Sequence, residues 1–152
     1  MSPNTYTTDQ YDPGRFRPHG RVEYEEQGRI LWSRATGPFN PELMQALSEL
    51  VIATFPAMTA KGPWVNICTF NHSALCSPDV LLSFTATMKQ LVQMKIAPVA
   101  TAFVLTPEVD GAELMAPLFE KCFKEGGIPF ACFPSIELAQ QWASSRLSPP
   151  QA

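Results

Sequence analysis

The apolar positions of the chain first follow the period of a β-strand. Val22 and Tyr24 alternate with charged residues, Gln27-Gly28 is a turn signal, and residues 30–35 form a second run of strand-forming side chains. Alternation places one side of each strand toward a core, and a short turn joins neighbouring strands in antiparallel order. The pattern therefore predicts a β-hairpin at the start of the folded region.

After the hairpin the period changes to that of a helix. Leu43, Leu47, Leu50, Val51 and Phe55 recur at the spacing that places apolar side chains on one helix face. Three further helical segments alternate with short apolar runs that are typical of buried strands. The predicted helices begin at Pro41, at Pro78, at Pro107 or alternatively at Asp110, and near Ser135, and the predicted strands between them cover residues 64–70, 99–105 and 128–133. The apolar residues of the third helix are Leu114, Leu118, Phe119 and Cys122.

Together these elements predict a single α/β domain in the order β-β-α-β-α-β-α-β-α. Crossover helices make the strands that they join parallel, whereas the hairpin is antiparallel, so we expect a mixed sheet of about five strands with four helices. The domain is expected to span residues 21–147. Residues 1–20 show neither period and are interpreted as a flexible N-terminal arm, and residues 148–152 as a C-terminal tail.

Composition narrows the class of protein. The chain has 152 residues, of which 45% are hydrophobic and 16% charged, and its 11 Lys and Arg against 14 Asp and Glu give a net charge of −3. This composition excludes global disorder and disfavours a nucleic-acid surface, which needs clustered basic residues. No signal-peptide core opens the chain, and no apolar run reaches the length of a membrane helix. We therefore expect a cytoplasmic protein whose four cysteines are reduced, with no membrane or nucleic-acid partner.

The residues suited to catalysis or metal binding are few. His72 is the only histidine of the predicted domain, so a nucleophile pair would combine it with a nearby cysteine or serine. Cys76 precedes a helix start, where the helix dipole lowers a thiol pKa, although a structural role is the simpler interpretation. Cys68, His72 and Cys76 are four residues apart, but they fall on a strand and a loop and lack a fourth ligand. We predict no catalytic residue, no metal and no cofactor.

Three helix starts share a pattern of capping residue, proline and acid. These are Asn40-Pro41-Glu42, Ser77-Pro78-Asp79 and Thr106-Pro107-Glu108. A side-chain oxygen at the first position accepts a backbone N–H, proline has no N–H to satisfy, and the acid is favoured at the positive end of the helix dipole. Capping alone accounts for Ser77.

The order of elements resembles a known family. The chain looks like the STAS domain in four features. They are the hairpin, the exit at residues 35–40 into an amphipathic helix, the buried strand followed by a loop that opens a helix at Ser77, and the last strand followed by residues 134–142. The spacing of Ala139 and Trp142 is similar to that of the divergent SpoIIAA-like branch. The likeness covers about residues 21–147 and depends on element order more than on residue identity.

The resemblance implies a function in partner switching. In the anti-sigma-factor antagonists of this family, a partner kinase phosphorylates a serine or threonine at the start of the second helix, which switches binding off. Ser77 matches that position, whereas Leu75 and Pro78 replace the family's acid and glycine. The resemblance thus implies a non-catalytic interaction module that docks with a kinase, an anti-sigma-like protein or another regulator. The implied docking residues are Ser73, Cys76, Asp79, Phe84 and Lys89.

Two alternatives stay open. Related folds also suggest a small apolar-ligand or nucleotide-binding carrier, and the many phenylalanines and methionines suit an apolar pocket. An enclosed apolar cavity would favour the carrier, and an apolar surface around Ser77 would favour docking. Composition does not decide whether the chain forms a homodimer through a sheet edge or a helix face.

Overall fold

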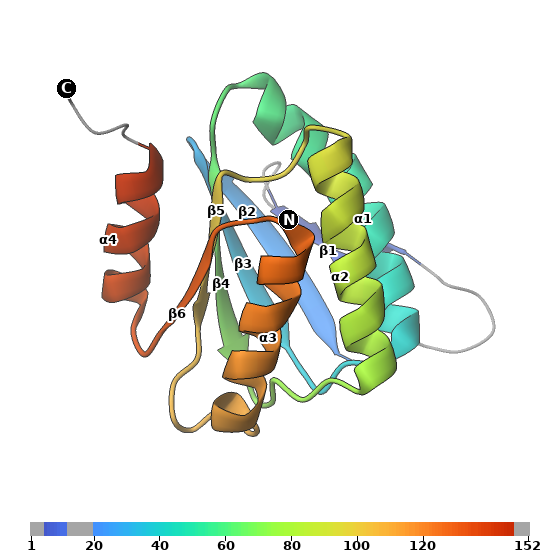
Figure 1. The fold of residues 1–152 in the computed structure, drawn as a ribbon. Coiled ribbons are helices and arrows are strands. Elements are labelled where there is room, and N and C mark those ends of the chain that lie inside the picture. Colours follow the sequence, from blue (N-terminus) through green and yellow to red (C-terminus); the bar gives the residue numbers. More distant parts are fainter. Residues whose placement is uncertain (1–4, 12–19, 148–152) are drawn as a thin grey trace.

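The computed structural model describes residues 5–11 and 20–147, which form one sheet with helices on both faces (Figure 1). The sheet has six strands in the described residues, and their spatial order is the same as their order in the chain. The first two pairings are antiparallel and the other three are parallel. The strands are β1 (Thr5–Thr7), β2 (Arg21–Gln27), β3 (Ile30–Thr36), β4 (Val65–Asn71), β5 (Ala100–Val104) and β6 (Phe130–Phe133).

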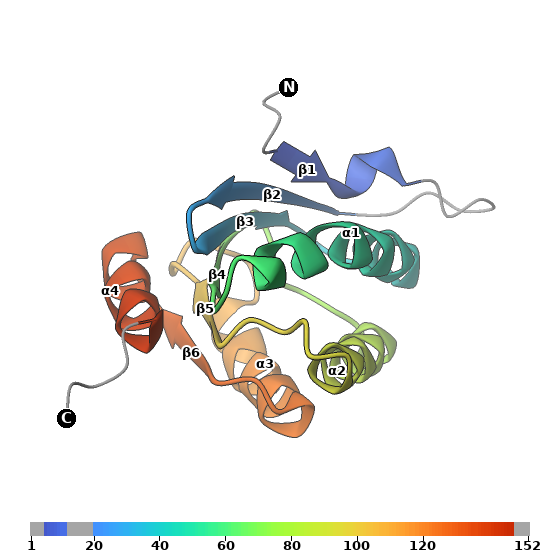
Figure 2. The ribbon, with the colours of Figure 1, turned by 90° about the horizontal axis from the view of Figure 1, so that it is seen from above.

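Three helices cover one face of the sheet and a fourth covers part of the other (Figure 2). The first group is α1 (Pro41–Ala60), α2 (Pro78–Gln93) and α3 (Ala112–Gly126), and the fourth helix is α4 (Ile136–Leu147). The larger core cluster lies beneath the first group, and a smaller one lies between α4 and the strands β4 and β5. Ala139 and Ala143 are fully buried there, because their small side chains let α4 approach the sheet closely.

The predicted fold class is confirmed. The described residues form a single α/β domain with a mixed sheet and four helices. The hairpin forms as expected, with Tyr24 opposite Ser33. Each strand that follows a crossover helix joins the sheet in parallel, as elements in this order should.

The structure differs from the prediction within residues 1–20. Thr5–Thr7 pair with β2 as a sixth strand, and Thr8–Gln10 form one 3₁₀ turn. The Thr8 hydroxyl accepts a hydrogen bond from the Val22 N–H at 3.0 Å, and Tyr6 and Tyr11 pack against the larger core. These contacts order residues 5–11, whose three-residue strand is too short to show a period. The rest of the expected arm and the expected tail, residues 148–152, lie outside the described residues.

The start of α3 also differs from both predicted positions. Gly111 is the N-cap residue, with a φ of 76° and no side-chain capping bond, and the helix begins at Ala112. The Asp110 N–H instead donates to the His72 carbonyl at 2.8 Å, and the Ala74 N–H donates to the Asp110 carbonyl at 2.9 Å. This pairing with another loop keeps Asp110 out of the helix, so tertiary contacts override the local capping signals.

One helix has the length and composition of a membrane span. In α1 an 18-residue window reaches a mean hydropathy of 1.3, and 50% of it is buried inside the fold. A helix that lies over the core of a domain has the same character, because its apolar face contacts the sheet. Length and composition are thus weak evidence for insertion.

Candidate functional site

Three loops meet at the end of the sheet where the parallel strands finish. They are residues 37–40, 72–77 and 105–111, which we call the loop rim. Phe39 donates its N–H to the Leu75 carbonyl at 3.1 Å, and Asp110 is hydrogen-bonded to both His72 and Ala74. Ligands and partners of open α/β sheets are commonly bound at this end, because the loops there project from a rigid scaffold. Backbone hydrogen bonds therefore join all three loops into one preformed surface.

Ser77 lies on the loop rim at the start of α2. Its side chain is exposed, and its hydroxyl accepts a hydrogen bond from the Val80 N–H at 3.3 Å. Its backbone is extended and Pro78 follows, as the capping pattern predicts. The capping role of Ser77 is thus confirmed, and the residue is also exposed at the surface.

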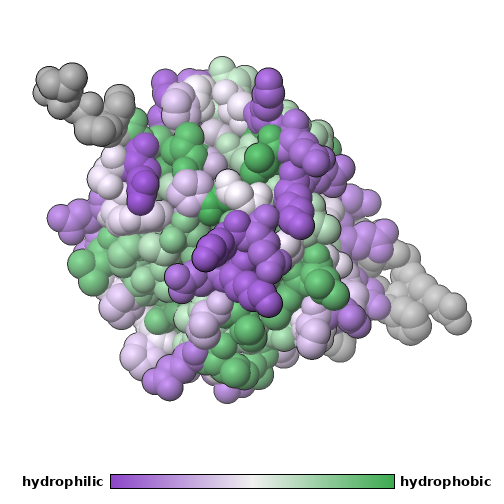
Figure 3. Space-filling model, viewed as in Figure 1, coloured by the Kyte–Doolittle hydropathy of each residue, from purple (hydrophilic) through white to green (hydrophobic). Residues whose placement is uncertain are grey.

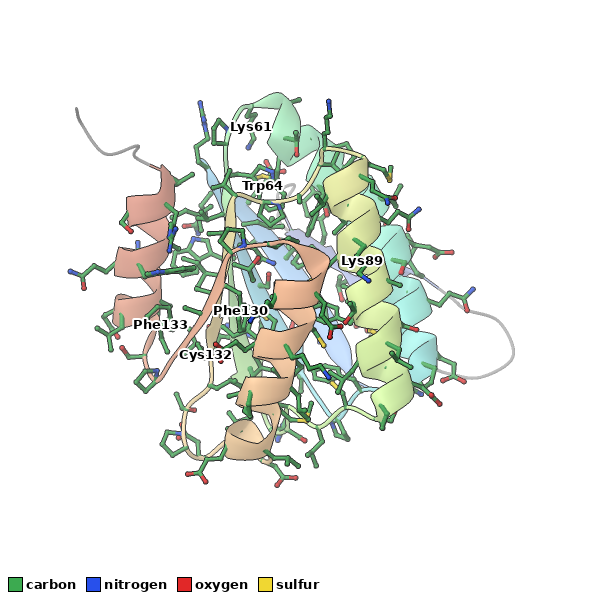
Figure 4. All side chains as sticks on the ribbon, viewed as in Figure 1. Lys61, Trp64, Lys89, Phe130, Cys132 and Phe133 are labelled. Atoms are coloured by element: carbon green, nitrogen blue, oxygen red, sulfur yellow. The ribbon has the colours of Figure 1, made fainter. Side chains whose placement is uncertain are left out.

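The other predicted docking residues lie at different depths. Asp79 and Lys89 are exposed on α2, and Figure 4 labels Lys89 there. Ser73 is 5% exposed, and its hydroxyl accepts the Leu75 N–H at 3.1 Å. Phe84 is half-buried, with its ring edge-on to Phe123 at a centroid distance of 5.4 Å. Asp79 and Lys89 are therefore available to a partner, whereas Ser73 and much of Phe84 serve the interior.

Cys76 does not have the environment of a nucleophile. Burial, with a smaller effect from neighbouring Cys122, raises the pKa of the Cys76 thiol to about 12. Desolvation disfavours the thiolate here more than the start of α2 stabilises it. Burial of Cys76 thus agrees with the structural role that the sequence favoured over an activated thiol.

The cysteines and His72 do not form a common site. Cys68 is buried beneath the helices, and burial raises its pKa well above the ordinary value, whereas His72 is exposed on the loop rim with a φ of 62°. All four cysteines are free thiols. Among the described residues, no group of three His, Cys, Asp or Glu side chains lies close enough to hold a metal ion.

Exposed leucines lie near the loop rim. Leu82 is 70% exposed in α2, and Leu114 and Leu118 are 64% and 38% exposed in the first half of α3. Figure 3 shows apolar surface over the beginnings of both helices, next to a hydrophilic area. The sequence pattern placed Leu114 and Leu118 among the apolar residues of the third helix, but Met115, Phe119 and Cys122 occupy its buried face. An apolar surface thus lies beside Ser77.

An apolar cavity lies between the sheet and the helices α1 and α2. Its volume is about 80 Å³, and most of its lining is aromatic or aliphatic. Tyr24, Ser33 and Asn66 supply polar atoms, and the Ser33 hydroxyl donates to Asn66 Oδ1. Burial raises the pKa of the Tyr24 hydroxyl, which keeps it neutral. The lining contains no Lys or Arg side chain that would bind a phosphate.

No family model, curated protein or solved structure matches this chain. The functional argument therefore depends on the geometry of the loop rim, the exposed leucines and the cavity.

Proposed function

We propose that this chain is a non-catalytic docking module of STAS type, in which a regulator binds beside Ser77. The observation that carries the proposal is Leu82, which is 70% exposed five residues after the exposed Ser77 cap. Together with the exposed Leu114 and Leu118 it contributes to the apolar surface near the loop rim, and an exposed apolar surface of several residues is typical of a docking site. The rigid loops reduce the ordering that binding would require.

Phosphorylation of Ser77 would act as the switch. A phosphate adds nearly two negative charges and three strong acceptors. It would lie two residues from the exposed carboxylate of Asp79 and five residues from Leu82, in the first two turns of α2. Like-charge repulsion and a strongly hydrated group in an apolar contact both weaken binding. The unmodified protein is therefore the binding form.

Quantitative capture from the protein's own cells tests this proposal. We expect wild-type protein and Ser77→Ala to retain the same partner, and Ser77→Asp and Leu82→Lys to retain about tenfold less. Ile52→Lys is a matched control, because Ile52 is 49% exposed on α1 and lies away from the loop rim. Equal capture by wild type, Ser77→Asp and Leu82→Lys would contradict the proposal.

We infer a cytoplasmic location for this module. The four thiols are free, and half of the apolar window of α1 is buried against the rest of the domain. Unpaired thiols suit a reducing compartment.

The cavity supports a second candidate, a carrier of a small apolar ligand. Its volume of about 80 Å³ is smaller than the roughly 150 Å³ of a cavity that holds benzene. A ligand larger than a few heavy atoms would therefore have to separate α1 from α2, so we prefer docking. Native mass spectrometry of the purified protein tests the carrier: a bound small molecule supports it, and bare protein counts against it.

A further inference from the structure

β6 is the edge of the sheet farthest from the hairpin, and its outer side is unpaired in the described residues. On its inner side, the Pro129 carbonyl accepts the N–H of Thr101 in β5, and the Phe133 carbonyl accepts the N–H of Leu105, which directly follows β5. Because backbone groups alternate along a strand, those of Ala131 also face β5, and those of Phe130 and Cys132 face outward. Two residues of β6 thus offer both an N–H and a carbonyl to a second strand.

The side chains of this edge are apolar on both faces. Phe130 stacks on Phe123 of α3 at a centroid distance of 4.2 Å, and Phe133 contacts Trp142 of α4 at 5.7 Å. All four residues of β6 are only half-buried. Phe130, Cys132 and Phe133 are labelled in Figure 4, between α3 and α4. Proteins usually protect an edge with charged side chains or a covering segment, but the strand itself carries no charge.

We propose that β6 pairs with β6 of a second copy of this chain and forms a symmetric dimer with one continuous sheet. In an antiparallel pair centred on Ala131, Phe130 lies opposite Cys132 of the other copy. Each such pair exchanges two hydrogen bonds, so the two pairs give four. Ala131 then faces its own counterpart, where strands approach most closely and a small side chain fits.

The charges of α3 identify a second copy as the occupant. Phe123 of α3 stacks on Phe130 and Glu120 lies one turn earlier on α3, toward Cys132, where burial and then the Glu120 charge raise the pKa of the thiol. Lys124 follows one turn later on the same face of α3, and both side chains are exposed. The step from Glu120 to Lys124 along α3 is about 6 Å, and the step from Cys132 back to Phe130 along β6 is about 6.6 Å, so the two steps nearly match. Lys124 therefore lies roughly level with Phe130, and the pairing brings Glu120 level with Lys124 of the other copy.

Prolines on both sides of β6 limit this contact. Pro129 precedes the strand and Pro134 follows it. Pro134 falls on the outward side and has no backbone N–H, and on the other side the Ile128 N–H already donates to the Phe123 carbonyl at 3.2 Å, so the pairing cannot extend past either position. A two-fold contact of defined length closes on itself, which favours a dimer over a filament.

Sedimentation equilibrium of the full chain tests the dimer. We expect wild type to have about twice the 16.8 kDa mass of one chain. Cys132→Pro removes an outward N–H but leaves the β5 pairing intact, so it should be monomeric, whereas Cys132→Ala keeps the N–H and should remain a dimer. Two results would overturn the proposal. One is a wild type that is monomeric at about 100 µM, and the other is a dimer that survives Cys132→Pro.

A charge exchange keeps the test valid if the proline variant fails to fold. Glu120→Lys should raise the dimer dissociation constant by about tenfold, and adding Lys124→Glu should restore it, because the two pairs are reversed together. A double variant no tighter than Glu120→Lys would contradict the register. Ala131→Cys in the Cys132→Ala background should also form an oxidised covalent dimer, since facing Cα atoms about 4.5 Å apart suit a disulfide.

Discussion

Ser77 holds the first turn of α2 through one hydrogen bond to the Val80 N–H. Replacing Ser77 by Ala removes this acceptor, and we expect a loss of about 1 kcal/mol in the free energy of unfolding. Ser77→Asn keeps a capping oxygen and should lose much less. Urea denaturation followed by circular dichroism measures both. Equal stability of the alanine variant and wild type would show that the cap contributes nothing.

Gly111 combines a left-handed backbone with close packing. Its φ is 76°, and an added Cβ would lie 2.4 Å from Leu75 Cδ2. Gly28 has a φ of 61° with no atom within 4 Å of an added Cβ, so it provides a matched control. We expect Gly28→Ala to cost about 1 kcal/mol and Gly111→Ala about 2–4 kcal/mol. Similar losses in thermal unfolding would show that Leu75 moves away freely.

Two half-buried thiols make stability depend on pH in the alkaline range. Burial is the main cause that raises the pKa values of Cys76 and Cys132 to about 12 in the folded protein, from about 9 when unfolded. The unfolded chain therefore releases these protons first, and stability present below pH 9 is lost as pH rises toward 12.

The control for this pH dependence is the double variant Cys76→Ala, Cys132→Ala. Urea unfolding is measured at about pH 8 and about pH 10.5, which lie on the two sides of an ordinary thiol pKa. Between these pH values the variant should lose less free energy of unfolding than wild type. An identical loss would mean that other groups account for the alkaline effect.

Residue patterns predicted the helix caps well where the cap is a local feature. Asn40 and Ser77 accept the N–H groups of Leu43 and Val80, as the shared pattern indicates. The same pattern at Thr106 does not begin a helix, because the following residues pair with the loop before α2. Nothing near Thr106 in the sequence reports that distant contact.

At the scale of elements, β1 and its 3₁₀ turn are attached by the pairing of β1 with β2 and by the buried Thr8. Its side chain is 2% exposed and accepts the Val22 N–H at 3.0 Å. Thr8→Val keeps the shape but leaves that N–H without its acceptor, so we expect a loss of about 1–3 kcal/mol. Thr5→Val is the control, because Thr5 is only half-buried. Urea denaturation in which both variants equal wild type would show that the segment is not anchored.

Element length decided which parts of the fold the sequence could predict. The long helices and the strands β2 and β3 show clear periods, the strands β4 to β6 are marked by apolar runs, and all of them appear where expected, whereas β1 has only three residues. The pattern of α3 was ambiguous in its face, because apolar residues stand at Leu114, Met115, Leu118 and Phe119. Packing against the sheet selects Met115 and Phe119 and leaves the two leucines exposed.

At the scale of the whole molecule, the two proposed contacts use different regions. Docking uses the loop rim and the start of α2, and self-association uses the outer side of β6 (Figures 1 and 2). A dimer would therefore carry two docking surfaces and could engage a two-fold symmetric partner with increased avidity. The sequence indicated Ser77 through element order, but the exposure of Leu82 and the free edge of β6 depend on tertiary packing.

Native mass spectrometry of the protein and its complexes, isolated from its own cells, tests the central claim most directly. The account predicts a free fraction that is about 80 Da heavier, with the added phosphate on Ser77, and a partner-bound fraction without it. A partner-bound fraction that carries the Ser77 phosphate as often as the free fraction would contradict the account.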